Sequence, residues 1–154
     1  MHLDRRGFLK VLGHVLTAYG LGAIGAYQYS IHLEPEWLSL KKIQIPLKNL
    51  DNDLNGFRIL QLSDIHYFPY TEIELVQSAV EITNKLNPDL VVLTGDYVLD
   101  LAEAIFDLAP VLSQINPVHG IFAILGNDDY WTNAEVVSQG LNQEGISVRM
   151  CQFG

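Results

Sequence analysis

From Phe57 onward the sequence repeats one pattern, in which an apolar run of strand length leads into a polar turn and then into a helical segment. The apolar runs occupy residues 57–62, 89–94 and 121–125, and a last one begins at Ile146. Strands that alternate with helices in this way form parallel sheets. The run at 89–94 is apolar enough for a strand that is covered on both faces. The pattern predicts an α/β fold with mainly parallel strands and flanking helices.

The turns between these runs contain signals for helix starts. Thr71 and Thr132 are each followed three residues later by a glutamate, and these capping boxes predict helices that begin there. Residues 101–115 are expected to form another helix, kinked or broken at Pro110. Apolar residues recur on one face of the first helix: Ile73, Val76, Val80 and Leu86.

Residues 1–33 have the layout of a targeting segment. Arg5 and Arg6 precede Phe-Leu-Lys, and residues 11–31 contain no Lys, Arg, Asp or Glu. This resembles a twin-arginine export signal, and the stretch is also long enough for a membrane anchor, so both alternatives stay open. A helix buried in the domain is disfavoured because four glycines would weaken it. We expect an N-terminal apolar helix and a location on the outer face of the cell membrane, or export.

Residues 34–56 are interpreted as a linker and an edge strand. The linker contains Glu-Pro-Glu-Trp-Leu, and residues 42–47 alternate as a short strand does. Pro46 would place this strand at a sheet edge, because proline lacks the N–H that an inner strand donates.

The composition limits the ligands that the chain can offer. It has 154 residues, a formal net charge of −9 and a single cysteine. An acidic body argues against nucleic acid as a partner, and one cysteine excludes a multi-cysteine metal site. Any metal would be held by oxygen and imidazole.

Three predicted strands end in polar clusters, which are Ser-Asp-Ile-His at 63–66, Gly-Asp-Tyr at 95–97 and Gly-Asn-Asp-Asp at 126–129. Asp96 follows Asp64 by 32 residues, and Asn127 follows Asp96 by 31. The carboxyl ends of adjacent parallel strands meet at one edge of the sheet, where ligand sites form. We therefore expect the three clusters to share one site.

The residue types in these clusters suit divalent metals. Asp64 and His66, two apart in a segment expected to be extended, would project to the same side and hold one ion. Asp96 has two oxygens with which to bridge two ions, and Asn127 offers a neutral oxygen to the second. Mixed ligation of this kind is compatible with manganese, iron or zinc.

These motifs, each closing a strand at regular intervals, resemble those of the calcineurin-like metallophosphoesterases, and among them a bacterial branch with twin-arginine or membrane signals. The resemblance implies the first half of an α/β/β/α sandwich, with a partial metallophosphoesterase domain at 57–154. It also implies hydrolysis of a phosphate ester or pyrophosphate by a water shared between two divalent metal ions. Asp64 and His66 would hold the first metal, Asp96 would bridge, and Asn127 would hold the second.

The third motif departs from the family pattern at Asp128, where the family has a histidine that contacts the substrate phosphate and assists the leaving group. Asp128 is thus the residue at the catalytic position. A carboxylate there would repel a phosphate unless it is protonated. Asp129 matches the family's acidic residue, which would steady the neighbouring side chain.

The family also uses later histidines that end in Gly-His-x-His, and this sequence reaches Gly154 without them. A truncated, non-catalytic and membrane-associated remnant is therefore the alternative to an active enzyme. In such a chain, apolar residues that should pack on a second sheet are expected on an uncovered face: Val91, Leu93, Ile121 and Ala123.

A nucleotide-binding domain is disfavoured, because no glycine-rich loop opens any predicted helix. The expected partner is a phosphorylated small molecule or a lipid-linked phosphate. His119 is interpreted as a surface or packing histidine. Six aromatic residues near the strand ends would form an apolar rim, although ordinary packing explains most of them: Tyr67, Phe68, Tyr70, Tyr97, Tyr130 and Trp131.

Overall fold

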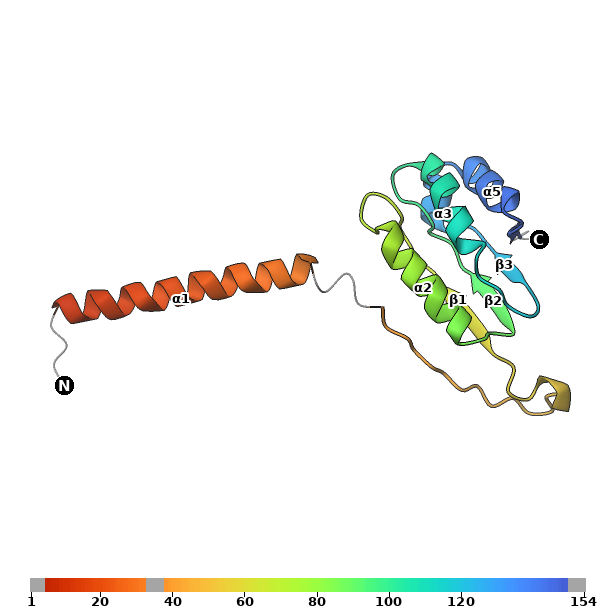
Figure 1. Cartoon of the computed structure of the whole chain (residues 1–154), viewed down its shortest axis with the longest axis horizontal. Helices are drawn as coiled ribbons and strands as arrows, with labels where there is room; N and C mark the ends of the chain where they lie inside the picture. The colour runs from red at the N-terminus through yellow and green to blue at the C-terminus, as the bar shows by residue number, and fades with distance from the viewer. Residues whose placement is uncertain (1–4, 33–37, 150–154) are drawn as a thin grey trace. The chain divides into compact units, whose positions relative to one another are not determined.

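A computed structural model describes residues 5–32 and 38–149 of the chain. The chain divides into two compact units after Lys42. The first contains helix α1 (Arg5–His32), and the second contains a four-stranded sheet with its helices (Figure 1). Residues 34–37 of the expected linker and residues 150–154 lie outside the described residues.

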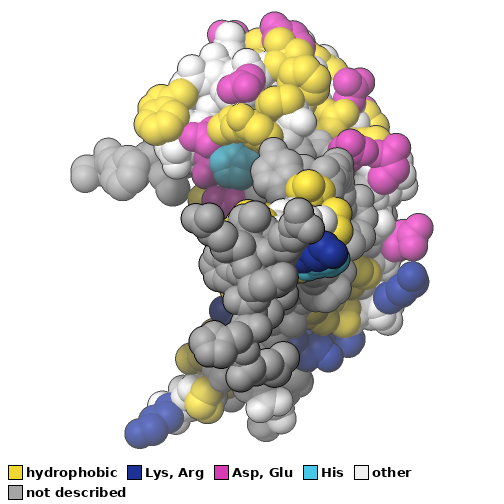
Figure 2. Space-filling model, turned by 90° about the vertical axis from the view of Figure 1, so that its left-hand side faces the viewer, with side chains coloured by type: hydrophobic (Ala, Val, Ile, Leu, Met, Phe, Trp, Pro, Cys, Tyr) yellow, Lys and Arg dark blue, Asp and Glu magenta, His cyan; other side chains and the backbone are white. Residues whose placement is uncertain are grey.

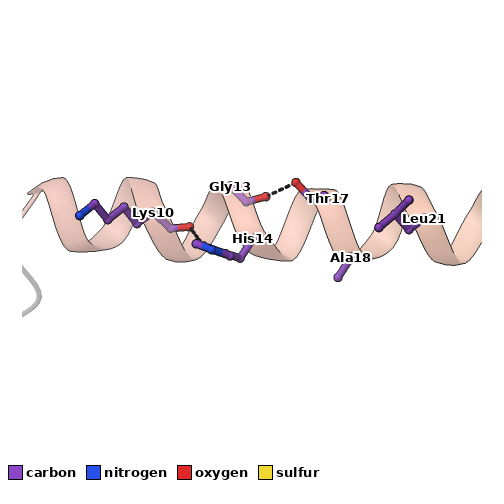
Figure 3. A pocket seen from close by; sticks show the side chains of 6 residues that line it. All are labelled: Lys10, Gly13, His14, Thr17, Ala18 and Leu21. Atoms are coloured by element: carbon purple, nitrogen blue, oxygen red, sulfur yellow. Dashed lines mark hydrogen bonds between the residues drawn. The ribbon is translucent and has the colours of Figure 1, made fainter.

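Helix α1 confirms the apolar helix expected at the N-terminus. Two of its polar side chains bond back to the helix backbone (Figure 3). His14 Nδ1 lies 2.6 Å from the Lys10 carbonyl oxygen. The Thr17 hydroxyl donates to the Gly13 carbonyl at 2.8 Å, so this hydroxyl has its hydrogen-bond partner within the helix. None of the helices that the structure describes combines the length and the apolarity that a membrane crossing requires.

The sheet confirms the predicted parallel α/β fold. Its strand order is β1-β2-β3-β4, and every neighbouring pair is parallel. Each strand lies within one of the predicted apolar runs. The strands are β1 (Ile59–Leu62), β2 (Leu90–Leu93), β3 (Ile121–Ala123) and β4 (Ser147–Val148).

Each connection between neighbouring strands contains one longer helix, and these helices lie together on one side of the sheet (Figure 1). They are α2 (Ile73–Lys85), α3 (Ile105–Leu112) and α5 (Ala134–Gln143). Each new strand is added at the same edge, so right-handed crossovers place every connecting helix on the same face. The expectation that β2 is covered on both faces is therefore wrong for the described part of the chain. Val91 and Leu93 are buried, whereas Leu90 and Val92 are half-buried.

The hydrophobic core lies between the sheet and the helices. Val76 and Val80 of α2 are buried in this core, and Ile73 packs against it, which confirms the predicted stripe at these positions. The residues expected on an uncovered face belong to or pack against the same core: Val91, Leu93, Ile121 and Ala123. That expectation is wrong.

The opposite face of the sheet carries the alternate residues, because successive side chains of a strand point to opposite faces. Ile59 is 62% exposed and Phe122 is 40% exposed. The Arg149 guanidinium lies over the Phe122 ring, 5.7 Å from its centroid. The open apolar surface of the sheet itself is therefore made of this second set.

The helix starts differ from the two predicted capping boxes. The Thr71 hydroxyl donates to the Ile65 carbonyl at 2.6 Å and does not cap α2. Asn133 caps α5 by accepting two backbone N–H groups. Thr132 instead ends a short helix, and its hydroxyl donates to the Asp128 carbonyl at 2.6 Å. Thr71 therefore bonds to the loop after β1, whereas Thr132 bonds back within its own short helix.

Pro110 lies inside α3, and the helix continues past it to Leu112. The departure from regular α-helix occurs earlier, in the 3₁₀ turn η2 (Ala102–Ala104). The expected helix is therefore confirmed without a break at the proline.

Residues 42–47 do not form the expected edge strand. Ile43 and Ile45 are 77% and 73% exposed. A strand requires a neighbour for its backbone N–H and C=O groups, and no backbone hydrogen bond joins this segment to a described strand. Alternation of apolar residues alone does not provide that neighbour.

Candidate metal centre

Asp64, His66 and Asp96 come together at the carboxyl edge of the sheet. Asp64 and His66 follow β1, and Asp96 follows β2. Each offers one ligand atom, and these atoms all lie within 4.8 Å of one another. The space-filling view shows acidic and hydrophobic side chains close together on one face (Figure 2). Two carboxylates and one imidazole at this spacing fit a divalent cation.

The loops after β1 and β2 are joined by backbone hydrogen bonds. Asp64 N–H donates to the Gly95 carbonyl at 3.2 Å, and His66 N–H donates to the Asp96 carbonyl at 3.0 Å. The segment is not extended as expected, because the φ angles of Asp64, His66 and Asp96 are 55°, 45° and 55°. Non-glycine residues rarely adopt this left-handed region, and such strain is concentrated at functional sites. The side chains of Asp64 and His66 come together because of this left-handed backbone, and not because side chains alternate along a strand.

Two glycines permit the close approach of the loops. Gly95 has a φ of +93°, and a Cβ atom there would collide with the Gly126 backbone. A Cβ atom on Gly126 would collide with the Asp96 carboxylate. Each position therefore requires a residue without a side chain, and the Asp96 carboxylate lies directly against the third loop.

The third cluster forms the start of a helix that was not predicted, α4 (Asn127–Thr132). Asp128 N–H donates to Asp96 Oδ1 at 3.0 Å. Asn127 Nδ2 donates to Asp128 Oδ1 at 2.6 Å. Asn127 therefore adjoins the cluster through Asp128, and its role as a ligand stays a prediction.

Asp129 holds the second and third loops together. Its carboxylate accepts from the backbone N–H groups of Asp96 at 2.8 Å, Tyr97 at 2.9 Å, Val98 at 3.3 Å and Gly126 at 2.9 Å. It is fully buried. Burial raises the pKa of Asp129, and these four hydrogen bonds oppose the rise. Asp129 thus positions the backbone of Asp96 and does more than steady a neighbouring side chain.

The aromatic residues near the site divide into two groups. Tyr97 is a core residue, whose hydroxyl donates to the carbonyls of Leu93 and Ile124 at 3.1 and 3.0 Å. Burial raises its pKa. Four others have exposed rings: Phe68, Tyr70, Tyr130 and Trp131. Ordinary packing thus explains Tyr97 and also Tyr67, which packs against the core, and leaves these four exposed, so the expectation that packing explains most of the six is wrong.

His119 lies away from this cluster in sequence and in its contacts. Its ring stacks on Phe57 with centroids 5.5 Å apart. Its backbone N–H donates to the Asp89 carbonyl at 2.7 Å. His119 is exposed, and its contacts are consistent with the interpretation as a surface or packing histidine.

A sequence model of the calcineurin-like phosphoesterases matches residues 57–151. The chain therefore belongs to this family, as its motifs predicted. No solved structure matches it significantly.

Several curated relatives are similar to the chain along most of its length. An uncharacterized metallophosphoesterase of Bacillus subtilis, YkuE, is 31% identical over 93% of this chain and 51% of its own length. The phosphodiesterase YaeI of Escherichia coli is 30% identical over 95% of this chain and 53% of its own. The UDP-2,3-diacylglucosamine pyrophosphatase LpxG of Chlamydia muridarum is 33% identical over 76% of this chain and 36% of its own. The chain spans about half the length of the first two relatives.

Proposed function

We propose that the chain belongs to an enzyme that hydrolyses phosphate esters or pyrophosphates with divalent metal ions. The observation that carries this proposal is the convergence of Asp64, His66 and Asp96, whose ligand atoms lie within 4.8 Å of one another at the sheet edge. Membership of the calcineurin-like phosphoesterases supports the same chemistry.

Each proposed ligand has a distinct task. Asp64 and His66 would hold the first ion, Asp96 would bridge, and Asn127 would hold the second. Asp96 Oδ1 is fixed by the Asp128 N–H, which supports a bridging role because the carboxylate is positioned in advance. The Asn127 amide nitrogen donates to Asp128, so a cation would use the amide oxygen.

The charge of the cluster explains why a cation is needed before phosphate can approach. Two carboxylates at this spacing repel a phosphate dianion, and the repulsion grows where water is excluded. The Asp64 side chain is 66% exposed, so the cluster is accessible from solvent. When bound, the cations would supply Lewis-acid stabilisation of charge on the phosphoryl oxygens.

We place the substrate among phosphorylated small molecules and lipid-linked phosphates or pyrophosphates. Tyr130 and Trp131 of α4 follow directly after the third motif and are 57% and 81% exposed. Aromatic rings next to a phosphate site suit a substrate with an apolar portion. The name of the LpxG relative, a pyrophosphatase of a diacylated sugar nucleotide, supports this class.

We also propose that residues 1–33 direct the protein to the outer face of the cell membrane or export it. The support is the Arg5-Arg6 pair, which stands where α1 begins, followed by a stretch without charged residues from 11 to 31.

The test is metal-dependent hydrolysis of an aryl phosphate diester by the full chain loaded with manganese. Asp64→Ala removes a proposed ligand, and Asp100→Ala removes an exposed carboxylate outside the cluster. Turnover that is lost in the first variant and kept in the second supports the proposal. Metal binding without turnover would instead support the non-catalytic alternative.

A further inference from the structure

The His66 ring lies between two carboxylates. Its Nε2 is 3.9 Å from Asp64 Oδ1, within the group of proposed ligands. Its Nδ1 is 3.2 Å from Asp128 Oδ2, on the other side of the ring. The two nitrogens therefore face different partners.

A histidine that binds a metal uses one ring nitrogen and carries a proton on the other. The hydrogen bond made by the second nitrogen decides which of them is protonated and how the ring is turned. In this chain Nε2 faces the ligand cluster and Nδ1 faces Asp128. A carboxylate is an acceptor, and of the two neutral forms of the ring only Nδ1–H places a proton on the nitrogen that lies 3.2 Å from Asp128 Oδ2.

Asp128 is itself held in place for this contact. Its Oδ1 accepts from Asn127 Nδ2 at 2.6 Å, which leaves Oδ2 toward His66. Its backbone N–H donates to Asp96 Oδ1 at 3.0 Å. The Asp128 side chain is only 11% exposed, in contrast to the accessible Asp64. These contacts position Asp128 against a ligand and leave little of it to meet a substrate.

We propose that Asp128 is a positioning residue for His66, which it fixes with a proton on Nδ1 so that Nε2 is free for a metal ion. This inference rests on the proposed function, because it assigns His66 as a ligand. The inference assigns a role to the Asp128 carboxylate, which stands where the family pattern has a histidine. Asp128 acts through His66 and not on the phosphate.

The first experiment measures the His66 tautomer in the metal-free full chain. Nitrogen-15 imidazole correlation spectra, recorded where imidazole is neutral and assigned with His66→Gln, separate the two forms. We expect Nδ1–H in the wild type, the same form in Asp128→Asn, which retains an acceptor oxygen, and a shift toward Nε2–H in Asp128→Leu. Asp100→Asn should match the wild type. An Nε2–H form of His66 in the wild type would overturn the inference.

The second experiment titrates manganese into the same proteins. Loss of an outer partner of a metal-binding histidine weakens metal affinity by roughly 10–100-fold, so Asp128→Leu should show a loss of this size and Asp128→Asn a smaller one. Unchanged affinity in both variants would contradict the inference. If Asp128→Leu does not fold, the inference is tested by the His66 tautomer in the wild type and by the manganese affinity of Asp128→Asn.

The two experiments separate this inference from the proposed function. A wild-type chain that binds no manganese would contradict the proposed function. The tautomer of His66 in the metal-free protein tests the contact with Asp128 in either case.

Discussion

The buried carboxylate of Asp129 accepts a hydrogen bond from the backbone N–H of Asp96 at 2.8 Å. The same carboxylate accepts from Gly126 N–H at 2.9 Å. One side chain therefore sets the distance between the loop that carries the proposed bridging ligand and the loop that begins α4. The placement of Asp96 depends on this buried carboxylate as much as on strand β2.

Replacing Asp129 by alanine should lower the free energy of unfolding by at least about 2 kcal/mol. The Asp129 carboxylate accepts from four backbone N–H groups. A buried N–H group that loses its acceptor costs roughly 1–3 kcal/mol, and some of these four groups would bind water instead. Chemical denaturation of the full chain measures the change. Asp100→Ala, at an exposed position, should change it by less than about 0.5 kcal/mol. Equal stability of the two variants would refute the proposed role of Asp129.

The glycines offer a matched pair of substitutions. Gly95 and Gly120 have similar φ angles, +93° and +87°, but a Cβ atom meets the Gly126 backbone at the first and open space at the second. Gly120→Ala should lose about 1–2 kcal/mol from backbone strain alone. Gly95→Ala should lose more, because the loops must also separate. Thermal unfolding of both variants decides, and an equal loss would mean that the close approach of the loops is not required.

The sheet faces can be distinguished by truncating one residue on each. Leu93 is 1% exposed and Phe122 is 40% exposed. Leu93→Ala should cost roughly 2–5 kcal/mol of unfolding free energy through loss of burial and a cavity. Phe122→Ala should cost about 1 kcal/mol, because much of its ring is already in water. A larger loss for Phe122→Ala would show that its face is covered in the folded protein.

The parallel fold was predictable from sequence because its signals are local. Each apolar run, such as residues 121–125, contains its strand, and helical segments between successive runs indicate parallel strands. Which face is covered was not predictable from the runs alone. The face depends on where all the helices lie, and Val91 and Val92 are equally apolar in sequence.

The site was predictable only in part. Asp64, His66 and Asp96 were identified because their motifs close successive strands. The left-handed backbone of Asp64 and His66 was not foreseen, because it is set by hydrogen bonds to a loop some thirty residues away. The linking role of Asp129 has one local sequence signal, its place in the first turn of α4, three residues after Gly126. This signal could not be used for a prediction, because helix α4 itself was not predicted.

The targeting proposal predicts that residues 1–42, fused to a reporter active only when exported folded, will carry it out of the cytoplasm. Replacing Arg5 and Arg6 by lysine should abolish export, because the twin-arginine route reads that pair. Replacing Lys41 and Lys42 by arginine serves as the control and should leave export intact. Export that survives loss of both arginines would exclude this route.

The central claim, that Asp64, His66 and Asp96 form one metal site, is tested most directly by titrating manganese into the full chain and following heat and the manganese electron paramagnetic resonance signal. The wild type and Asp100→Ala should bind with the same affinity. Asp96→Ala should bind far more weakly, because the carboxylate shared by the cluster is gone, while its thermal unfolding remains cooperative. Manganese binding in folded Asp96→Ala at wild-type affinity, or no binding in the wild type, would contradict the account.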